Sequence, residues 1–145
     1  MKSKLGLAIA IASKAFKDKV DKGGKPYILH CLRVMHKMHT DDEDTNIVAV
    51  LHDLLEDCPE WTASRLAKKG IPQRAITSLL LLTHDHNVSY EDYIKIVATD
   101  EIATKVKLSD LKDNSNITRL KGLTKKDFDR MEKYHKAYTY LSKTK

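Results

Sequence analysis

The sequence predicts an all-α fold, a compact bundle of about seven or eight helices that forms a single domain over residues 1–145. Hydrophobic residues make up 41% of the chain and charged residues 32%, which is typical of a globular protein rather than a disordered one. Glycine and proline are scarce, with 5 and 3 residues, and the alternating β-branched pattern of strands is hard to find. Apolar residues recur at helical spacing instead. The length suffices for one continuous core.

The first part of the chain predicts three helices. The first covers about residues 3–19 and stops at the glycine-containing turn 21–26, where Pro26 can open the second helix. Acidic residues 41–44 suit the start of the third helix, because negative charge is favourable at a helix N-terminus. The apolar spacing that follows predicts one continuous helix as far as Cys58, where Pro59 ends it.

Local capping signals divide the rest of the chain. Thr62 is a suitable N-cap, and Gly70 closes the short helix that follows it. Ser89 and Thr124 each stand three residues before an aspartate, in the pattern of a capping box. The helices expected here cover about residues 63–69, 72–82, 90–98, 101–114 and 125–141.

The N-terminal segment has two interpretations. Apolar residues 5–12 resemble the core of a short signal peptide, but Lys14 and Lys17 follow at once and the helical pattern continues, which favours the first helix of the fold. No stretch approaches the roughly 20 apolar residues of a membrane span. Cys31 and Cys58 form neither a disulfide framework nor a C-x-x-C motif. We therefore expect a cytoplasmic protein with no membrane partner.

The net charge indicates an anionic partner. The formal charge is +6 and the pI is near 9.2, but no nucleic-acid-binding motif accompanies this excess. A phosphorylated small molecule explains the charge, and so does a merely soluble surface. We expect a small-molecule nucleotide substrate and no nucleic acid. The sequence is compatible with a homo-oligomer but does not fix the oligomeric state.

The dipeptide His52-Asp53 lies in the otherwise apolar helical run 48–57. A buried charge costs several kcal/mol unless it is paired or coordinated, and imidazole and carboxylate ligands suit Mn, Fe, Co or Zn ions. Helix neighbours diverge by about 100°, so other helices must supply further ligands. His30 and Asp110 are the candidates, since each interrupts an apolar helical pattern. Any one of these residues is better explained as a structural polar group, but the four together favour a metal site.

Two carboxylates follow the dipeptide one turn later. Glu56 lies four residues after His52, and Asp57 lies four residues after Asp53, so each would share a helix face with its partner. Carboxylates beside a metal-bound water can hold or deprotonate that water, or protonate a leaving oxygen. A solvated helix C-terminus is the alternative, and it is less favourable because acids there oppose the helix dipole.

Two further i, i+4 pairs are candidate substrate contacts. Asp110 and Asn114 share a helix face, as a metal ligand and an amide contact to substrate would, although Asn114 could equally cap the helix. Arg130 and Tyr134 could hold a phosphate and flank a base. The pattern alone favours an exposed arginine beside a core tyrosine for this second pair.

Three motifs at compatible spacing over residues ~15 to ~140 resemble the HD-domain superfamily. They are Gly23–His30 with Arg33-Val34, then Leu51–Asp57, then Lys107–Asn114. Within that superfamily the chain is similar to the (p)ppGpp hydrolase domain of RelA/SpoT proteins and to small single-domain alarmone hydrolases. The resemblance implies the HD-domain fold and removal of the 3′-pyrophosphate of ppGpp or pppGpp, which gives GDP or GTP and pyrophosphate.

The resemblance also assigns roles to individual residues. The residues that would bind one Mn²⁺ ion are His30, His52, Asp53 and Asp110. Those that would position and activate the attacking water are Glu56 and Asp57. Contacts to the nucleotide would come from Lys19, Lys22, Asn114, Arg130 and Tyr134.

The chain departs from the family pattern at two places. Cys31 stands where relatives commonly have proline, and Asp18-Lys19 stands where many have Gly-Gln. Both departures concern the nucleotide pocket rather than the metal, so the chemistry is better specified than the substrate. Another nucleotide, such as pppApp, NADPH or a nucleoside monophosphate, is therefore an alternative substrate. A third hypothesis is a catalytically silent HD protein that binds nucleotide. The presence of the Glu56-Asp57 pair argues against this hypothesis.

Overall fold

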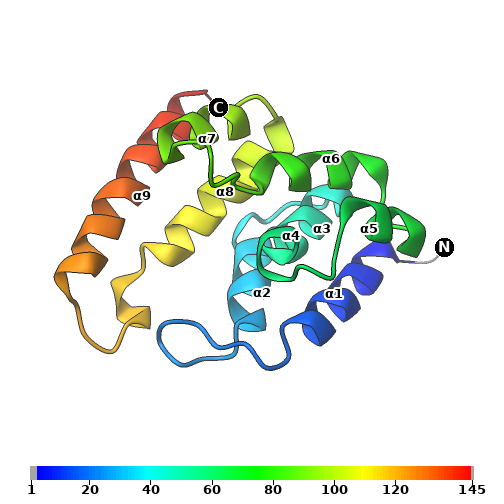
Figure 1. The fold of residues 1–145 in the computed structure, drawn as a ribbon, viewed down its shortest axis with the longest axis horizontal. Coiled ribbons are helices and arrows are strands. Elements are labelled where there is room, and N and C mark those ends of the chain that lie inside the picture. The colour runs from blue at the N-terminus through cyan, green and yellow to red at the C-terminus, as the bar shows by residue number, and fades with distance from the viewer. Residues whose placement is uncertain (1–2, 145) are drawn as a thin grey trace.

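The computed structural model describes residues 3–144 and confirms the all-α prediction (Figure 1). Within these residues there are nine α-helices, one of them a single turn, and a 3₁₀ helix, with no β-strand. The elements are α1 (Lys4–Ala15), α2 (Ile28–Lys37), α3 (Glu43–Leu51), α4 (Leu54–Asp57), α5 (Ala63–Lys69), α6 (Gln73–Leu82), α7 (Tyr90–Val97), α8 (Glu101–Asn114), η1 (Ile117–Arg119) and α9 (Lys125–Thr144).

Helix α3 forms the centre of the core. Its residues 47–51 are completely buried, because α1, α2, α6 and α8 all pack against it. Helix α9 lies on the outside of the bundle along α8 and also contacts α7 (Figure 1). Burial of apolar surface stabilises such an arrangement by roughly 25 cal/mol per Å², so α3 is held more firmly than any peripheral helix. The residues that directly follow α3, His52 and Asp53, are consequently attached to a firmly packed helix.

The predicted capping signals are present. The side chains of Thr62 and Ser89 accept hydrogen bonds from backbone amides three residues later, at 3.1 Å each. Gly70 has a φ of 99°, the left-handed conformation that glycine adopts at low cost at a helix end. At the start of α9, the Asp127 carboxylate accepts a hydrogen bond from the Thr124 amide at 2.8 Å. This is the bond that the acidic residue of a capping box makes back to the N-cap residue.

Two predicted helix boundaries are wrong. The first helix ends at Ala15 rather than at Lys19, and residues 16–19 turn into a loop that the Val20–Pro26 bridge closes. The third helix is not continuous, because it stops at Leu51 and resumes at Leu54. At this break the His52 ring donates from Nδ1 to the Ala49 carbonyl oxygen at 2.7 Å, and a side-chain bond of this kind competes with the helical backbone pattern.

The long helix α9 is amphipathic and carries many charged residues. Among the residues that the structure describes, no helix combines the length and the apolar character that crossing a bilayer requires. This finding agrees with the absence of a long apolar run in the sequence.

Candidate metal centre

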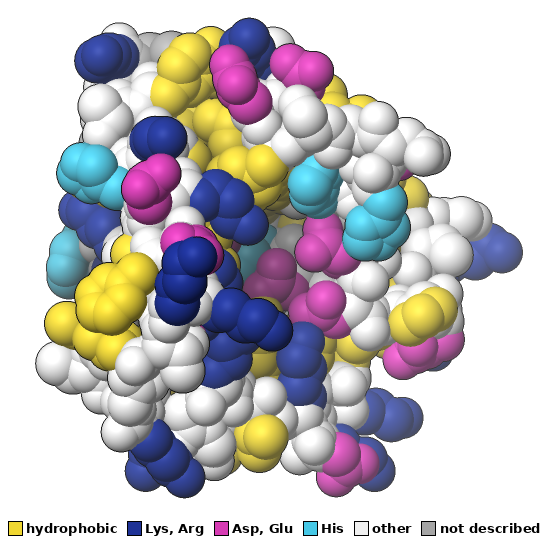
Figure 2. Space-filling view, turned by 60° about the vertical axis from the view of Figure 1, so that its left-hand side comes forward, with side chains coloured by type: hydrophobic (Ala, Val, Ile, Leu, Met, Phe, Trp, Pro, Cys, Tyr) yellow, Lys and Arg dark blue, Asp and Glu magenta, His cyan; other side chains and the backbone are white. Residues whose placement is uncertain are grey.

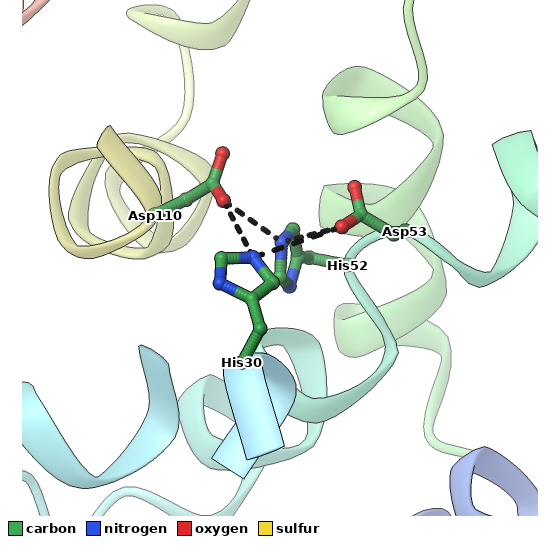
Figure 3. Close-up of side chains that lie close together, drawn as sticks. All are labelled: His30, His52, Asp53 and Asp110. Atoms are coloured by element: carbon green, nitrogen blue, oxygen red, sulfur yellow. Dashed lines mark hydrogen bonds and ion pairs between the residues drawn. The ribbon is translucent and has the colours of Figure 1, made fainter. Parts of the chain in front are cut away.

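Four side chains from three separate segments converge in the interior (Figure 3). His30 comes from α2, His52 and Asp53 come from the break between α3 and α4, and Asp110 comes from α8. One ligand atom from each lies within 4.8 Å of all the others. This is the set that the sequence predicted as metal ligands, and the structure brings all four together. The three packed helices therefore build a cluster that could hold a metal ion.

The spacing of the ligand atoms fits a single cation. Asp110 Oδ1 lies 3.0 Å from His30 Nε2 and 3.2 Å from His52 Nε2. Asp53 Oδ2 lies 3.0 Å from His52 Nε2 and 3.9 Å from His30 Nε2. Metal–ligand bonds to nitrogen and oxygen are about 2.0–2.2 Å long, so neighbouring ligand atoms around one ion stand about 3.0–3.5 Å apart. Two imidazoles and two carboxylates suit a borderline divalent ion such as Mn, Fe, Co or Zn.

The carboxylates around the cluster raise the pKa values of both histidines. Burial lowers the pKa of His52, but the carboxylates of Asp53 and Asp110 raise it well above its ordinary value. Burial likewise lowers the pKa of His30, and hydrogen bonds to Asp110 and Asp113 raise it overall. Burial raises the pKa of Asp53, yet the neighbouring His52 lowers it to about 2. The carboxylates thus attract positive charge, which protons or a metal ion can supply.

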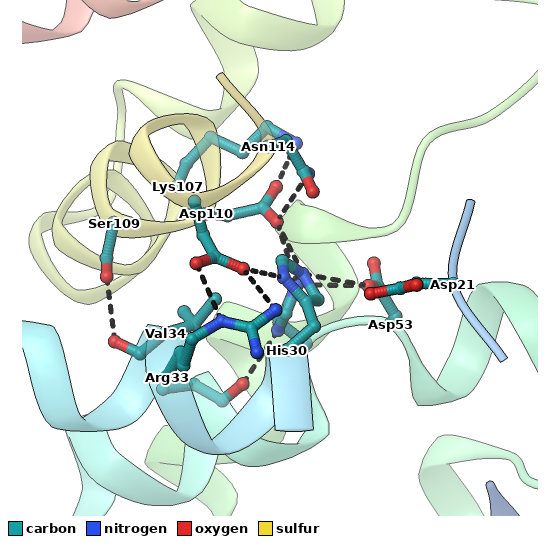
Figure 4. A network of polar contacts seen from close by, with 12 residues as sticks. Asp21, His30, Arg33, Val34, Asp53, Lys107, Ser109, Asp110 and Asn114 are labelled. Atoms are coloured by element: carbon teal, nitrogen blue, oxygen red, sulfur yellow. Dashed lines mark hydrogen bonds and ion pairs between the residues drawn. The ribbon is translucent and has the colours of Figure 1, made fainter. Parts of the chain in front are cut away.

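Asp113 fixes the orientation of the His30 ring. Figure 4 shows the polar network around His30, Arg33 and Asp110 to which this contact belongs. Asp113 lies one helical turn beyond Asp110 on α8, is fully buried, and places Oδ2 2.6 Å from His30 Nδ1. Since Nδ1 bonds to Asp113, Nε2 is left to face the cluster, as is usual for histidines that bind metals. Arg33 and Lys37 hold the other Asp113 oxygen, each at 2.9 Å. Sequence analysis missed Asp113, although its spacing of three residues from Asp110 was an available signal.

Two more groups that the sequence analysis did not single out contact the cluster. The Tyr27 hydroxyl donates to Asp53 Oδ2, and Lys107 Nζ lies 2.9 Å from Asp110 Oδ2. Burial lowers the pKa of Lys107, but Asp110 raises it well above its ordinary value. Tyr27 and Lys107 each precede a candidate ligand by three residues and so share its helix face. Helical spacing could have identified both.

The two carboxylates of α4 line the same cavity as the cluster. This cavity measures about 380 Å³, and Glu56 and Asp57 lie on its wall with His52 and Asp53. Glu56 accepts a hydrogen bond from the His84 amide at 2.9 Å, while Asp57 forms an ion pair with Lys19 at 2.6 Å. Both acids are therefore held beside the cluster. Lys19, which was predicted as a nucleotide contact, forms its ion pair with Asp57 in this structure.

A second cavity, also of about 380 Å³, adjoins the first. The two share Tyr27, Asn114 and Tyr134 in their walls. Asn114 donates to Asp110 Oδ1 at 3.0 Å, so this predicted substrate contact already touches the cluster. Tyr134 is half-buried between the two cavities rather than part of the core. One face of the molecule is hollowed, with acidic and histidine side chains deep inside and Lys and Arg side chains beside them (Figure 2).

The second cavity is cationic. Lys22, Arg119 and Arg130 line it. All five predicted nucleotide contacts lie in its wall, since Lys19, Asn114 and Tyr134 line it as well. Burial lowers the pKa of Lys22, and the positive charge of Arg130 lowers it further. Arg130 also pairs with Asp127 at the start of α9. The metal cluster and this concentration of positive charge thus line two neighbouring cavities that share three wall residues.

Comparison with known proteins adds no assignment to this geometry. The chain matches no protein-family model, and a search of curated proteins returns no similar sequence. The functional argument therefore depends on the arrangement of the residues themselves.

Proposed function

We propose that this protein is a metal-dependent phosphohydrolase of the HD type that removes the 3′-pyrophosphate of ppGpp or pppGpp. One observation carries the proposal. A cluster of four metal-capable side chains, with two carboxylates beside it, opens into a cavity of concentrated positive charge. A substrate with a phosphoryl group to be cleaved at one end and further phosphates at the other would match this distribution of charge.

The metal would be held by His30, His52, Asp53 and Asp110, with Mn²⁺ as the expected ion. When bound, it supplies a Lewis acid that polarises phosphoryl oxygen and lowers the pKa of a water molecule. In the reaction the water oxygen forms a bond to the phosphorus atom that is attached to the ribose 3′-oxygen. The bond between this phosphorus and the ribose 3′-oxygen breaks. The ribose oxygen gains a proton, so the products are a 5′-phosphorylated nucleoside and pyrophosphate.

The side chains around the cluster have separate tasks in this proposal. Glu56 and Asp57 accept the proton of the attacking water and hold that water in place. Lys107, fixed 2.9 Å from Asp110, adds positive charge beside the reacting phosphate. Lys22 and Arg130 bind the remaining phosphates of the nucleotide, and Tyr134 flanks its base or ribose between the two cavities.

A cytoplasmic setting belongs to the same proposal. Cys31 and Cys58 are both free and buried, and burial raises the pKa of Cys31 to about 12. Such thiols act as packing groups. A chain that uses its cysteines in this way is suited to the reducing compartment where nucleotides of this class are found.

Product analysis by ³¹P NMR tests the proposal. Protein loaded with Mn²⁺ is expected to convert ppGpp to GDP and pyrophosphate, and Asp53→Ala is expected to abolish turnover while circular dichroism stays helical. Asp129→Ala is a matched control, since this exposed α9 carboxylate lines neither cavity. The same assay on pppApp, NADPH and nucleoside monophosphates identifies a different substrate. Tight ppGpp binding without turnover on any metal would contradict the hydrolase.

A further inference from the structure

A third and larger cavity has both members of the Lys19–Asp57 ion pair in its wall. It measures about 790 Å³ and is lined by α1, by residues 16–19 that follow it, and by the segment 57–69. Its apolar part includes Leu7, Ile11 and Phe16. None of the four candidate metal ligands lines it, so it is a different cavity from that of the metal cluster, with which it shares the wall residue Asp57.

The rim of this cavity carries an excess of positive charge. Five basic residues line it, against the three acids Asp18, Asp57 and Glu60. The basic residues are Lys14, Lys17, Lys19, Arg65 and Lys69. Within the described part of the chain, no ion pair is formed by Lys14, Lys17, Arg65 or Lys69. An anionic ligand would therefore meet cations that are not already neutralised by a partner.

The same cavity contains a stacked pair of planar groups. The guanidinium carbon of Arg65 lies 3.9 Å from the ring centroid of Trp61, which is half-buried. Arg65 is exposed, and its guanidinium group donates a hydrogen bond to the Glu60 carbonyl oxygen at 3.0 Å. Indole and guanidinium planes both stack on nucleobases, with each base contributing about 1–3 kcal/mol on an aromatic platform. A planar aromatic ring is therefore suited to this position.

From the aromatic pair, the apolar floor and the unpaired lysines, we propose that this cavity binds a second nucleotide. The base stacks on Trp61 and Arg65, and the phosphates lie at Lys14, Lys17 and Lys19. Inorganic phosphate alone would use the lysines and leave the apolar wall uncovered. A nucleoside without phosphate would leave the lysines unpaired.

Lys19 connects this second site to the metal cavity. Its ammonium group lies 2.6 Å from Asp57 and 4.0 Å above the Tyr27 ring, and it lines the large cavity as well. Phosphate bound in the large cavity competes with Asp57 for Lys19 and so weakens the ion pair. This regulatory consequence rests on the proposed function, because it matters only if Asp57 acts on the water. The binding site itself does not.

Intrinsic fluorescence tests the binding site directly, since Trp61 is the single tryptophan of the chain. GDP titrated into metal-free protein is expected to change the fluorescence saturably, whereas guanosine and pyrophosphate bind at least tenfold more weakly. The double variant Lys14→Ala/Lys17→Ala is expected to weaken GDP binding by about tenfold. Lys22→Ala, in the cationic cavity near the metal cluster, is the matched control and leaves this signal unchanged. The proposal is overturned if GDP has no effect, if pyrophosphate binds as tightly, or if only Lys22→Ala abolishes the change.

The link through Lys19 has its own test, which requires no catalysis. Asp57→Asn keeps the shape of the side chain but frees Lys19, so GDP is expected to bind roughly fivefold more tightly in the fluorescence titration. An unchanged or weaker affinity would show that the two cavities are not coupled. A failure of ppGpp hydrolysis, by contrast, affects neither titration, so the two proposals can fail independently.

Discussion

Asp110 and Asp113 stand one turn apart on α8, both are buried, and both contact His30, yet their surroundings differ. Asp113 is neutralised by Arg33, Lys37 and Arg119, which keep their charge at any physiological pH. Asp110 has one such cation, Lys107, and otherwise faces two imidazoles, which can lose their protons. A carboxylate with three permanent counter-ions is structurally complete, whereas one that faces removable protons is prepared to exchange them for a cation.

The first and largest expected effect is on activity. Asp110→Asn removes a ligand atom from the cluster, so we expect ppGpp turnover to fall by at least about a thousandfold. Asp113→Asn leaves every candidate ligand in place and disturbs only the orientation of His30, so a loss of about 10- to 100-fold in metal affinity is expected. Calorimetric titration with Mn²⁺ measures the metal affinity of both variants. Equal losses of Mn²⁺ affinity in Asp110→Asn and Asp113→Asn would contradict the comparison.

Stability is expected to show the reverse order in metal-free protein. Asp113→Asn leaves Arg33, Lys37 and Arg119 without their shared partner. We expect the free energy of unfolding to fall by about 3 kcal/mol. This value is at the lower end for a broken buried ion pair because Arg33 and Lys37 reach solvent. Asp110→Asn should cost less, about 2 kcal/mol, since the histidines can release their protons and Lys107 alone loses a permanently charged partner. Urea unfolding gives both values. If Asp110→Asn proves the more destabilising, Asp110 is a structural residue.

The pH dependence of the melting temperature sharpens the same distinction. Because the folded-state pKa values of His30 and His52 are raised, their contribution to stability is fully present below the unfolded pKa of about 6.5 and is lost as the pH rises through the folded values. Metal-free protein should therefore melt at lower temperature as the pH increases above about 6.5. Added Mn²⁺ should stabilise more strongly at the higher pH, where the rings are free of protons. If the rise in melting temperature that Mn²⁺ causes does not increase with pH, this account is contradicted.

The smallest expected effect concerns a single cation at Asp113. Lys37→Met removes one of several positive charges, and Lys37 is partly exposed, so the loss should be about 0.5 kcal/mol. Arg33→Met removes two hydrogen bonds at 2.9 and 3.2 Å and should cost more. Urea unfolding of the two variants measures the difference. Equal losses would indicate that Asp113 depends on total charge rather than on the arginine fork.

The sequence predicted the helices and the four candidate ligands because both depend on local patterns. Thr62, Ser89 and Gly70 act through neighbours within a few residues, and the structure confirms these caps. His30, His52 and Asp110 are polar residues in apolar helical runs, and that contrast identifies a buried polar group wherever the helices meet.

The remaining features depend on side-chain contacts that the apolar pattern of the sequence does not encode. The break at His52 involves a side-chain bond to Ala49, while the apolar spacing on either side is that of an unbroken helix. Lys19 lines the cationic cavity with the other predicted nucleotide contacts, but its ion pair with Asp57, 38 residues away, was not predicted, because it depends on the loop that follows the end of α1 at Ala15. Asp113 was missed because its cations come from α2 and η1.

The interruption between α3 and α4 divides the backbone into pieces of very different rigidity. The end of α3 is anchored by fully buried neighbours, whereas α4 is a four-residue helix whose Leu54 alone is buried. Amide hydrogens of α3 should thus exchange with solvent far more slowly than those of α4. The acidic pair can therefore shift while the imidazoles stay in place. Engineering of this scaffold could accordingly vary the α4 turn while the frame of candidate metal ligands stays fixed.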